Sequence, residues 1–316
     1  MAIHNLSNIY ILMLNVSILG SSGFIGKHLS QLLFKNSDLN LRLFGRRNVN
    51  SFNQPMPYFQ IDLNNSDQIR EYLKETDVLY YLISDSIPLT NWNNPILEVK
   101  NNLLPFIKTM DILSTEKLKK VVFVSSAGTI YGSSKTHLSE SSSVNPFSPY
   151  GIIKFCMENF LNYYDKRFGV KYDIFRVSNV FGPGQNISKG LGIINTFLEK
   201  IVSDRQIFIY GNGQSVRNYI YISDVVDILS LSLNSLSSSH VFNLSSNDNI
   251  SINELVKIIK SLVNEEFNII YKEARQSDNP CIFLDNNKLK NHFNGFVFTQ
   301  LTDGILETYN FIKSNI

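Results

Sequence analysis

A glycine-rich turn between an apolar strand and a helix constrains this chain more than any other feature. Asn15 to Leu19 form a short apolar run, three glycines follow it, and Lys27 to Phe34 then repeat apolar residues at helical spacing. Glycine lets the backbone approach a pyrophosphate, and the helix start offers free N–H groups and a positive dipole end. We expect the phosphates of a bound nucleotide cofactor to contact the turn and the first helical residues. These residues are Gly20, Gly23, Phe24, Ile25 and Gly26.

Such a turn also occurs in α/β proteins that bind no nucleotide, so the rest of the chain has to support this interpretation. Further strands are expected at Leu39 to Phe44, Tyr58 to Leu63, Val78 to Ile83 and Lys120 to Ser125, with helical patterns between them. This alternation predicts an α/β fold with a Rossmann-type, doubly wound parallel sheet.

The length of the chain favours two lobes. A chain of 316 residues that is 43% hydrophobic can bury a large core. We expect an NAD(P)-binding Rossmann domain over residues 1–177 and a smaller C-terminal substrate-binding domain over residues 178–316. Residues 218–247 are expected to return to the Rossmann domain.

Tyr150 and Lys154 stand one helical turn apart, after two turn signals that each contain a proline. A tyrosine pKa lies near 10, so a phenolate near neutral pH needs about 4 kcal/mol of stabilisation from positive charge. Lys154 and an oxidised nicotinamide ring can supply it, which makes Tyr150 a candidate acid/base. The alternative is a solvent-facing pair on an amphipathic helix.

Six motifs, in order and in register, carry a resemblance to a known family. They are GSSGFIG at 20–26, SSAGTIYG at 125–132, SPYGIIK at 148–154, RVSNVFGPGQ at 176–185, YGNGQSVRNYIYISDV at 210–225 and RQSD at 275–278. From about residue 14 to the C-terminus the chain resembles the extended short-chain dehydrogenase/reductases, in their NAD-dependent epimerase/dehydratase branch. Within that branch it is most similar to UDP-hexose 4-epimerases such as the UDP-glucose 4-epimerases.

The resemblance implies an activity, a cofactor and partners. It implies a cytoplasmic homodimer that pairs helices near residues 95–115 and 148–165. The substrate is expected to be a UDP-hexose or UDP-N-acetylhexosamine, epimerised by transient oxidation at C4, in a pathway such as polysaccharide assembly. The cofactor is expected to be NAD, with NADP possible. Two alternatives stay open: a nucleotide-sugar reductase or dehydrogenase of the same family, and a non-catalytic NAD(P)-binding scaffold or sensor.

The usual hydroxyl of the family is missing from this chain. Many relatives place Ser or Thr four residues before the Tyr-Gly pair of the second motif, where this chain has Ala127. In an extended segment residue 129 points the same way as residue 127, so Thr129 is our first candidate for the substrate-polarising hydroxyl. Ser125 is the second and Ser126 the third. The Asp-Glu pair of sugar 4,6-dehydratases is also absent, since Gly128 and Thr129 stand in its place, and this disfavours a dehydratase.

The resemblance also assigns binding residues outside the turn. For the substrate it implies Asn179 in the pocket, Arg217 and Arg275 on the diphosphate, and Asp278 near the nucleotide ribose. For the cofactor it implies Asp62 with its neighbour Leu63 near the adenine, and Asn102 in support of Lys154. Two departures concern the substrate: Asn218 replaces the usual Asp after Arg217, and residues 294–300 lack a Gly-Trp-x-Pro motif.

The end of the second strand differs from that of relatives that use NAD. They usually carry an Asp or Glu there, which accepts a hydrogen bond from the ribose 2′-OH and repels a 2′-phosphate. This chain has Gly45, Arg46 and Arg47 instead. The arginines either bind near the ribose or are ordinary solvated charges. We therefore expect weak discrimination against NADP.

Composition argues against several other kinds of partner and binding site. The net charge is +2 and there is no long basic run, so we expect no nucleic-acid partner. Two cysteines indicate a reducing compartment, and five histidines without ligand spacing predict no metal site. The apolar run from Ile9 to Leu14 is too short to span a membrane. We expect residues 1–12 to be a loose tail or a product of start-site annotation.

Overall fold

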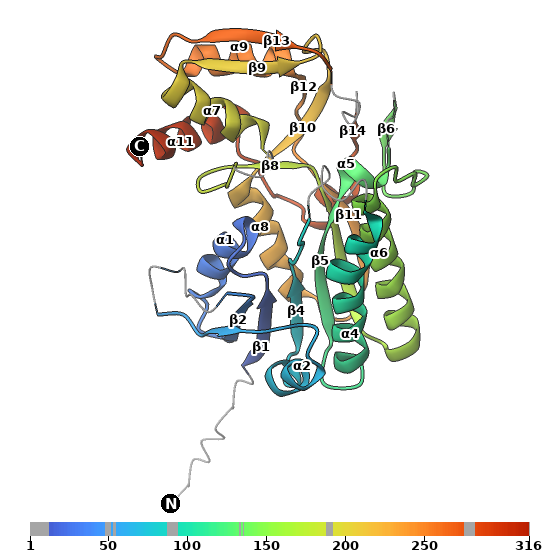
Figure 1. Ribbon diagram of the computed structural model, residues 1–316. Helices are drawn as coiled ribbons and strands as arrows, with labels where there is room; N and C mark the ends of the chain where they lie inside the picture. Colours follow the sequence, from blue (N-terminus) through green and yellow to red (C-terminus); the bar gives the residue numbers. More distant parts are fainter. Residues whose placement is uncertain are drawn as a thin grey trace, which may run out of the picture.

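The computed structural model describes residues 13–47, 52, 55–86, 94–132, 134, 136–187, 192–274 and 282–315. Its centre is a seven-stranded sheet in the order β11-β7-β5-β4-β1-β2-β3, and every neighbouring pair is parallel (Figure 1). The strands are β1 (Leu14–Leu19), β2 (Leu39–Gly45), β3 (Tyr58–Gln60), β4 (Val78–Tyr81), β5 (Lys120–Ser126), β7 (Lys171–Val177) and β11 (His240–Leu244). The predicted Rossmann-type fold class is confirmed.

The strand order reverses between β1 and β4. In open α/β sheets, ligands bind outside the carboxyl ends of the strands at such a point. β3 is shorter than predicted and ends at Gln60, because Asp62 begins a turn in which its Oδ1 accepts from the Asn64 amide at 2.9 Å.

Two apolar layers cover the two faces of the sheet. Tyr80 packs in the layer of α1 and α8, and its hydroxyl donates to the Leu229 carbonyl oxygen of α8 at 3.0 Å. The next residue, Tyr81, packs in the opposite layer of α2, α4 and α6. This alternation follows from the two-residue period of a strand. The helices are α1 (Phe24–Leu33), α2 (Ser66–Leu73), α4 (Leu104–Leu113), α6 (Pro149–Phe168) and α8 (Ile222–Leu231).

Short elements connect the layers at the carboxyl side of the sheet. A single turn of helix, α3 (Pro95–Glu98), continues through a π-helix (Val99–Leu103) into α4. Another single turn, α5 (Ala127–Ile130), follows β5 directly. At the opposite, amino end of the sheet a 3₁₀ turn (Ser232–Asn234) follows α8, and its Ser232 carbonyl oxygen accepts from Lys120 Nζ at the start of β5.

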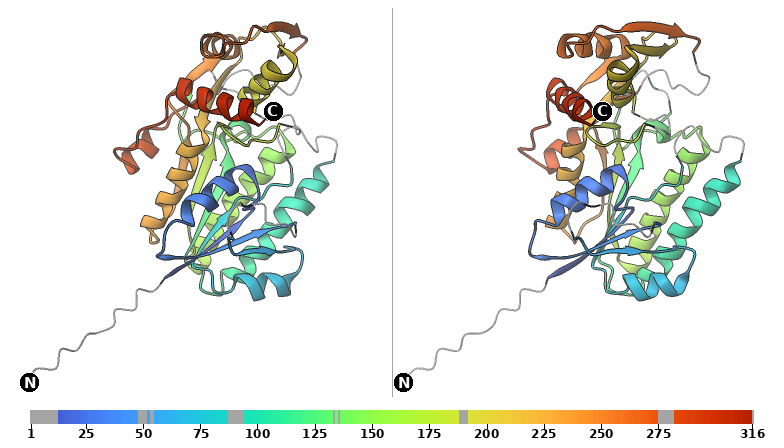
Figure 2. Two further views of the ribbon diagram at one scale, coloured as in Figure 1. Left: turned by 90° about the vertical axis from the view of Figure 1, so that its left-hand side faces the viewer. Right: turned by 60° about the vertical axis from the view of Figure 1, so that its left-hand side comes forward.

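A smaller lobe lies beyond the carboxyl ends of the sheet strands (Figures 1 and 2). Its strands are β8 (Asn179–Phe181), β10 (Val216–Tyr221) and β12 (Asn249–Ser251), with the pairs β9 (Gln206–Tyr210) and β13 (Asn268–Lys272), and β6 (His137–Leu138) and β14 (Phe283–Leu284). Its helices are α7 (Ile193–Asp204), α9 (Ile252–Leu262) and α11 (Leu301–Ser314), whereas α10 (Asn287–His292) packs against β11 at the edge of the large sheet.

Local sequence explains where the principal helices begin and end. Ser148 caps α6 by accepting the Gly151 amide at 3.1 Å, Pro149 occupies the first turn, and Gly169 ends the helix at a φ of 77°. Ser251 and Glu254 form a reciprocal capping box at the start of α9.

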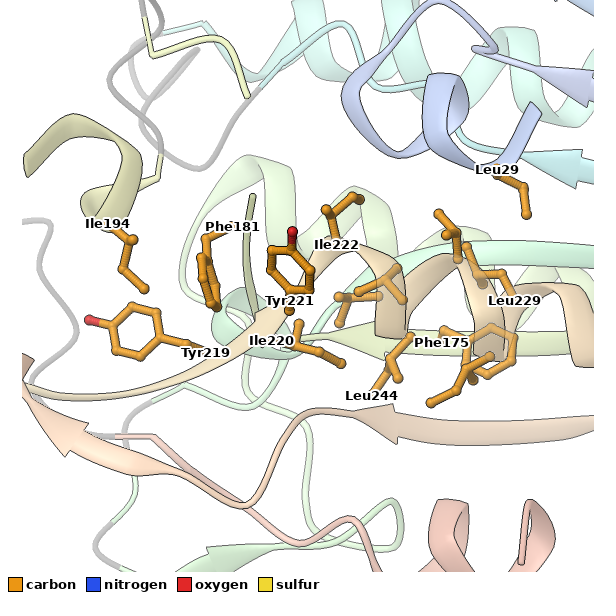
Figure 3. Packing of buried hydrophobic residues seen from close by; sticks show 14 of the residues in the cluster. Leu29, Phe175, Phe181, Ile194, Tyr219, Ile220, Tyr221, Ile222, Leu229 and Leu244 are labelled. Carbon is orange, nitrogen blue, oxygen red and sulfur yellow. The ribbon is translucent and has the colours of Figure 1, made fainter. Parts of the chain in front are cut away.

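Continuous apolar packing joins the two lobes. Phe181 of β8 and the stretch Tyr219 to Ile222, from β10 into α8, belong to the same buried cluster as Leu29 and Phe175 of the large sheet layer (Figure 3). The chain thus leaves the smaller lobe through α8, which packs against α1, and β11 then joins the edge of the large sheet.

None of the helices in the described part of the chain is long and apolar enough to cross a membrane. Within the same residues, no group of three or more His, Cys, Asp or Glu side chains is placed to hold a metal ion.

Replacing Gly26 with Ala should destabilise the protein, because the added Cβ would lie 2.1 Å from the Gly20 carbonyl oxygen, a backbone atom. We expect a loss of about 3 kcal/mol in the free energy of unfolding, measured by urea denaturation. Gly128→Ala is the matched control, since its Cβ would meet only the Ile282 Cδ1 at 3.8 Å. Equal stability of the two variants would contradict the packing argument.

Candidate active site

The turn between β1 and α1 is shaped by close backbone contacts. Gly20 has a φ of +88°, and a Cβ at this position would lie 3.0 Å from the backbone of Leu82. The Gly23 amide donates to the Gly20 carbonyl oxygen at 3.0 Å. Gly23 is the N-cap residue of α1, no side chain caps the helix, and its first turn contains no acid. The first-turn N–H groups, which belong to residues such as Phe24 and Ile25, therefore suit a pyrophosphate.

The end of β2 lies beside this turn. A Cβ at Gly45 would lie 2.3 Å from the Tyr58 Oη and 3.2 Å from the Ser22 Oγ, so the tyrosine occupies the space of a side chain here. Arg46 Nη1 pairs with Asp85 Oδ1 at 2.8 Å, while 83% of the Arg46 side chain remains exposed. A pair this exposed contributes little stability, and the guanidinium can exchange partners. Arg47 is exposed.

The two residues expected near the adenine follow β3. Asp62 is exposed, and its Oδ1 accepts from the amide and the side chain of Asn64. Leu63 is buried in the layer of α2 and α4. Asp62 is therefore the member of this pair whose polar atoms face solvent.

Tyr150 and Lys154 lie on α6 beside the carboxyl end of β5. Lys154 is only 6% exposed, and its Nζ donates to the Val124 carbonyl oxygen at 3.0 Å. The same Nζ lies 5.8 Å from the centre of the Tyr150 ring, which is half-buried. The pair is thus not the solvent-facing pair that the sequence left open.

Burial controls the charge of both groups. It lowers the pKa of Lys154 to about 8, against the opposing effect of the Glu158 and Glu98 carboxylates. It raises the pKa of Tyr150 to about 12, against the opposing effect of the Ser84 side chain. The Tyr150 phenol is therefore protonated at neutral pH until further positive charge is placed beside it.

The hydroxyl-rich segment is not extended as predicted. β5 ends at Ser126, and residues 127–130 form the helical turn α5, so the alternation that placed residues 127 and 129 on one face does not apply. That premise was wrong. The choice of Thr129 over Ser125 and Ser126 stays a prediction and now depends on burial and contacts.

Two hydroxyls of this segment are buried and have no hydrogen-bond partner among the described residues. They are the Thr129 Oγ1 and the Ser125 Oγ, whereas Ser126 is half-buried. Thr129 also lies against the start of α6, because a Cβ at Gly151 would come within 2.4 Å of its carbonyl oxygen. A buried hydroxyl without a partner has the chemistry to donate to a ligand.

Asn102, which the family resemblance assigned to the site, belongs to a polar cluster whose other members the sequence did not single out. Asn102, of the π-helix, donates to Glu98 Oε2 at 2.8 Å and accepts from the Asp85 amide at 2.9 Å. Ser86 Oγ donates to the same Glu98 oxygen at 2.7 Å. Glu98 and Ser86 carried no motif that could have marked them, and only the folded chain brings them to Asn102.

The substrate-side residues are spread along β8 and β10. Asn179 is exposed and its Nδ2 donates to the Asn218 carbonyl oxygen at 2.8 Å. Arg217 is half-buried, and its Nη1 donates to the Val216 carbonyl oxygen at 3.0 Å. Asn218 is buried and donates to the Ser246 carbonyl oxygen at 3.0 Å.

Three expectations lie outside the described residues and so are neither supported nor opposed. Arg275 and Asp278 belong to one such segment, and the N-terminal tail over residues 1–12 is another.

Comparison with known proteins gives three principal findings. Residues 16–245 match the model of the NAD dependent epimerase/dehydratase family. The chain is 27% identical, over 95% of its length and 99% of the relative's, to a putative UDP-glucose 4-epimerase of Methanocaldococcus jannaschii. It is 35% identical to a dTDP-4-dehydro-6-deoxyglucose reductase of Escherichia coli, over 53% of each chain.

A solved structure supports the same comparison. The UDP-N-acetylglucosamine 4-epimerase of Methanobrevibacter ruminantium M1, in complex with UDP-N-acetylmuramic acid, superposes with a TM-score of 0.87 at 26% identity. The match covers 96% of this chain and 99% of that one.

An acid at the end of β2 should sharpen the preference for NAD over NADP by repelling a 2′-phosphate. Because Tyr58 Oη blocks a side chain at position 45, the change is Gly45→Asp in a Tyr58→Phe background. We expect the ratio of NADP to NAD affinity to fall about tenfold relative to Tyr58→Phe alone. Titration of both dinucleotides into cofactor-free protein measures this ratio. An unchanged ratio would show that this position does not distinguish a ribose with a 2′-phosphate from one without it.

Proposed function

The chain belongs to the NAD dependent epimerase/dehydratase family, and we propose on that premise that it is a nucleotide-sugar 4-epimerase. Its substrate would be a UDP-hexose or a UDP-N-acetylhexosamine, and its cofactor NAD. The relatives named above support this class of reaction, since two of the three carry the name of a UDP-sugar 4-epimerase.

One observation carries the proposal. Tyr150 and the buried Lys154 lie at the carboxyl end of β5, and the glycine turn leaves the carboxyl end of β1, with only β4 between these two strands in the sheet. A phenol next to a buried ammonium is thus placed beside the crevice where a dinucleotide binds in this fold. A scaffold or sensor has no need of such a pair.

Each residue of the candidate site has a proposed role in the reaction. Tyr150 takes the proton of the C4 hydroxyl, and Lys154, fixed by the Val124 carbonyl oxygen, stabilises the phenolate. NAD, held by the glycine turn, would supply the acceptor of the C4 hydride and the donor that returns it to the opposite face of the sugar. Tyr150 then gives its proton back to the C4 oxygen, so that proton and hydride both balance.

The buried hydroxyls and the arginine of β10 complete the proposed site. Thr129, or Ser125, donates to the C4 oxygen while charge develops on it. Arg217 binds the diphosphate, a task suited to a planar guanidinium, and Asn179 borders the sugar. Arg275 and Asp278 keep the roles that the family resemblance implies.

The domain division, the oligomeric state and the cellular role belong to the same proposal. We place the Rossmann domain at residues 1–177 and the substrate domain at 178–316, with residues 218–247 returning to the first, and this division is supported by the packing of α8 on α1.

Exposed apolar side chains on the helices expected to pair, among them Ile96, Leu104, Ile152 and Tyr163, support a homodimer. A cytoplasmic role in polysaccharide assembly would suit a sugar-nucleotide substrate.

A reductase is the second candidate, and two observations favour it. The Escherichia coli reductase is the relative with the higher identity, although the match spans only half of each chain. The arginines after β2 also suit the 2′-phosphate of NADPH.

A panel of UDP-hexoses and UDP-N-acetylhexosamines, separated after incubation, tests the proposed function. An epimerase interconverts a pair of sugars without net loss of cofactor. Net consumption of NADH or NADPH with a keto-sugar nucleotide would favour the reductase instead.

Tyr150→Phe should lower turnover by about 100-fold or more, the scale expected when a positioned acid/base is removed. The variant should keep its fold and its bound cofactor, because the ring remains. Tyr163→Phe is the matched control, since this exposed tyrosine lies on the same helix. Turnover within a few-fold of wild type in Tyr150→Phe would overturn the mechanism.

Thr129→Val should lose far more turnover than Ser126→Ala, about 100-fold against a few-fold, because of these two residues Thr129 is the one with a buried hydroxyl that has no partner among the described residues. Valine keeps the shape of threonine and so separates the hydroxyl from the packing. Initial rates at saturating substrate measure the effect. The reverse ranking would assign the polarising hydroxyl to the end of β5.

A further inference from the structure

An ion pair joins the segments that follow β2 and β4, and the proposed reaction gives it no part. Arg46 is the first residue after β2, and its Nη1 lies 2.8 Å from Asp85 Oδ1, in the segment after β4. β1 lies between β2 and β4 in the sheet (Figure 1). The pair therefore spans the carboxyl end of β1, where the glycine turn begins.

Asp85 is the fixed partner of this pair. Its backbone amide donates to Asn102 Oδ1 at 2.9 Å, and Asn102 is itself buried and donates to Glu98 Oε2 at 2.8 Å. The second carboxylate oxygen, Asp85 Oδ2, accepts from Asn101 Nδ2 at 3.1 Å. One oxygen therefore faces the π-helix and the other faces Arg46, and hydrogen bonds to the π-helix hold the carboxylate in place.

Arg46 has a fixed backbone and an exchangeable guanidinium. Its carbonyl oxygen accepts from Gln60 Nε2 at 3.1 Å, whereas most of its side chain is exposed to solvent. An ion pair this exposed contributes little stability. The guanidinium can therefore leave Asp85 for a partner that binds it better, and a phosphate dianion is such a partner because it can accept two parallel hydrogen bonds.

The end of β2 is the place where dinucleotide-binding sheets distinguish the two nicotinamide cofactors. An acid there accepts from the ribose 2′-OH of NAD, whereas an arginine nearby accommodates the 2′-phosphate of NADP. In this chain Gly45 stands at the end of β2, and Tyr58 Oη fills the space of a side chain. Arg46 alone would favour NADP, but Asp85 brings a carboxylate to the same place from the other side of β1.

We propose that Asp85 is the residue by which this chain favours NAD over NADP, in place of the carboxylate that β2 lacks. It holds the Arg46 guanidinium and adds a negative charge beside it. A 2′-phosphate has to displace Asp85 from Arg46 and then lie next to the released carboxylate, whereas a 2′-hydroxyl does neither. The inference rests on the proposed function only in taking NAD as the cofactor that the glycine turn holds.

Binding of the two dinucleotides to cofactor-free protein, measured by calorimetry, is the direct readout. Asp85→Asn keeps the shape of the side chain and removes its charge, so the ratio of NADP to NAD affinity should rise about tenfold. Asp85→Glu keeps the charge and should leave the ratio within about threefold of wild type. Asp67→Asn, a change of an exposed acid on α2, removes the same charge elsewhere and should leave the ratio unaltered.

The part played by Arg46 is tested separately. Arg46→Ala removes the guanidinium and leaves the Asp85 carboxylate, so the ratio of NADP to NAD affinity should fall about threefold. In the Arg46→Ala background, Asp85→Asn should raise the ratio only about threefold, because repulsion is relieved but no guanidinium is released. Arg47 stays constant in every variant.

A pair of smaller probes assigns the effect to the ribose. The affinity of adenosine 2′,5′-bisphosphate relative to that of AMP should shift in parallel with the dinucleotide ratio, because the two probes differ only in the 2′-phosphate. A shift confined to the dinucleotides would contradict the proposed role of Asp85.

The outcomes separate this inference from the proposed function. An unchanged ratio in Asp85→Asn, or an equal gain with and without Arg46, would overturn the inference even if UDP-sugars are epimerised. A raised ratio that depends on Arg46 would support it even if no UDP-sugar is turned over, in which case the proposed function alone fails.

Discussion

The contact between Gly26 and the Gly20 carbonyl oxygen is the constraint on which the rest of the structure depends. It lets the first turn of α1 lie directly over the end of β1, at a distance that no side chain would allow. The axis of α1 is fixed by this crossing, and α8 packs along it. Because α8 is continuous with β10, the same contact sets where the smaller lobe meets the carboxyl edge of the sheet.

The ionisable side chains at the centre of the site are buried, and their hydrogen bonds do not fully offset the cost of placing a charge there. Lys154 is almost completely enclosed, yet in the structure its ammonium donates to a carbonyl oxygen rather than forming an ion pair within 4 Å of a described acid. Burial alone drives the phenol toward its neutral form and the ammonium toward its neutral form as well. A positively charged ring beside Tyr150 would reverse the first of these effects, so such a site is activated by the cofactor it binds.

The polar side chains that lie between the two lobes are hydrogen-bonded to one another, whereas two hydroxyls of the candidate site are not. Arg176 Nη1 donates to the Tyr131 hydroxyl at 2.7 Å, and that hydroxyl donates to Asn243 Oδ1 at 2.7 Å. Asn243 Nδ2 in turn donates to the Leu138 and Asp285 carbonyl oxygens, one beside β6 and one beside β14. The polar groups of this network satisfy one another, whereas the buried hydroxyls of Ser125 and Thr129 have no partner among the described residues and so have hydrogen-bonding capacity left for a ligand.

The sequence by itself determined the parallel α/β fold, the glycine turn and the Tyr150–Lys154 pair, because strand and helix periods and one helical turn of spacing are local properties. It could not determine the geometry of residues 127–130, where a helical turn replaced the expected extended chain, since a short segment follows its tertiary contacts rather than its own preference. Nor could it place the Glu98–Ser86–Asn102 cluster against α6. Those residues come from a helix and a loop separated from α6 by about fifty residues or more, and only the packing of α3 and the π-helix against α6 sets them beside it.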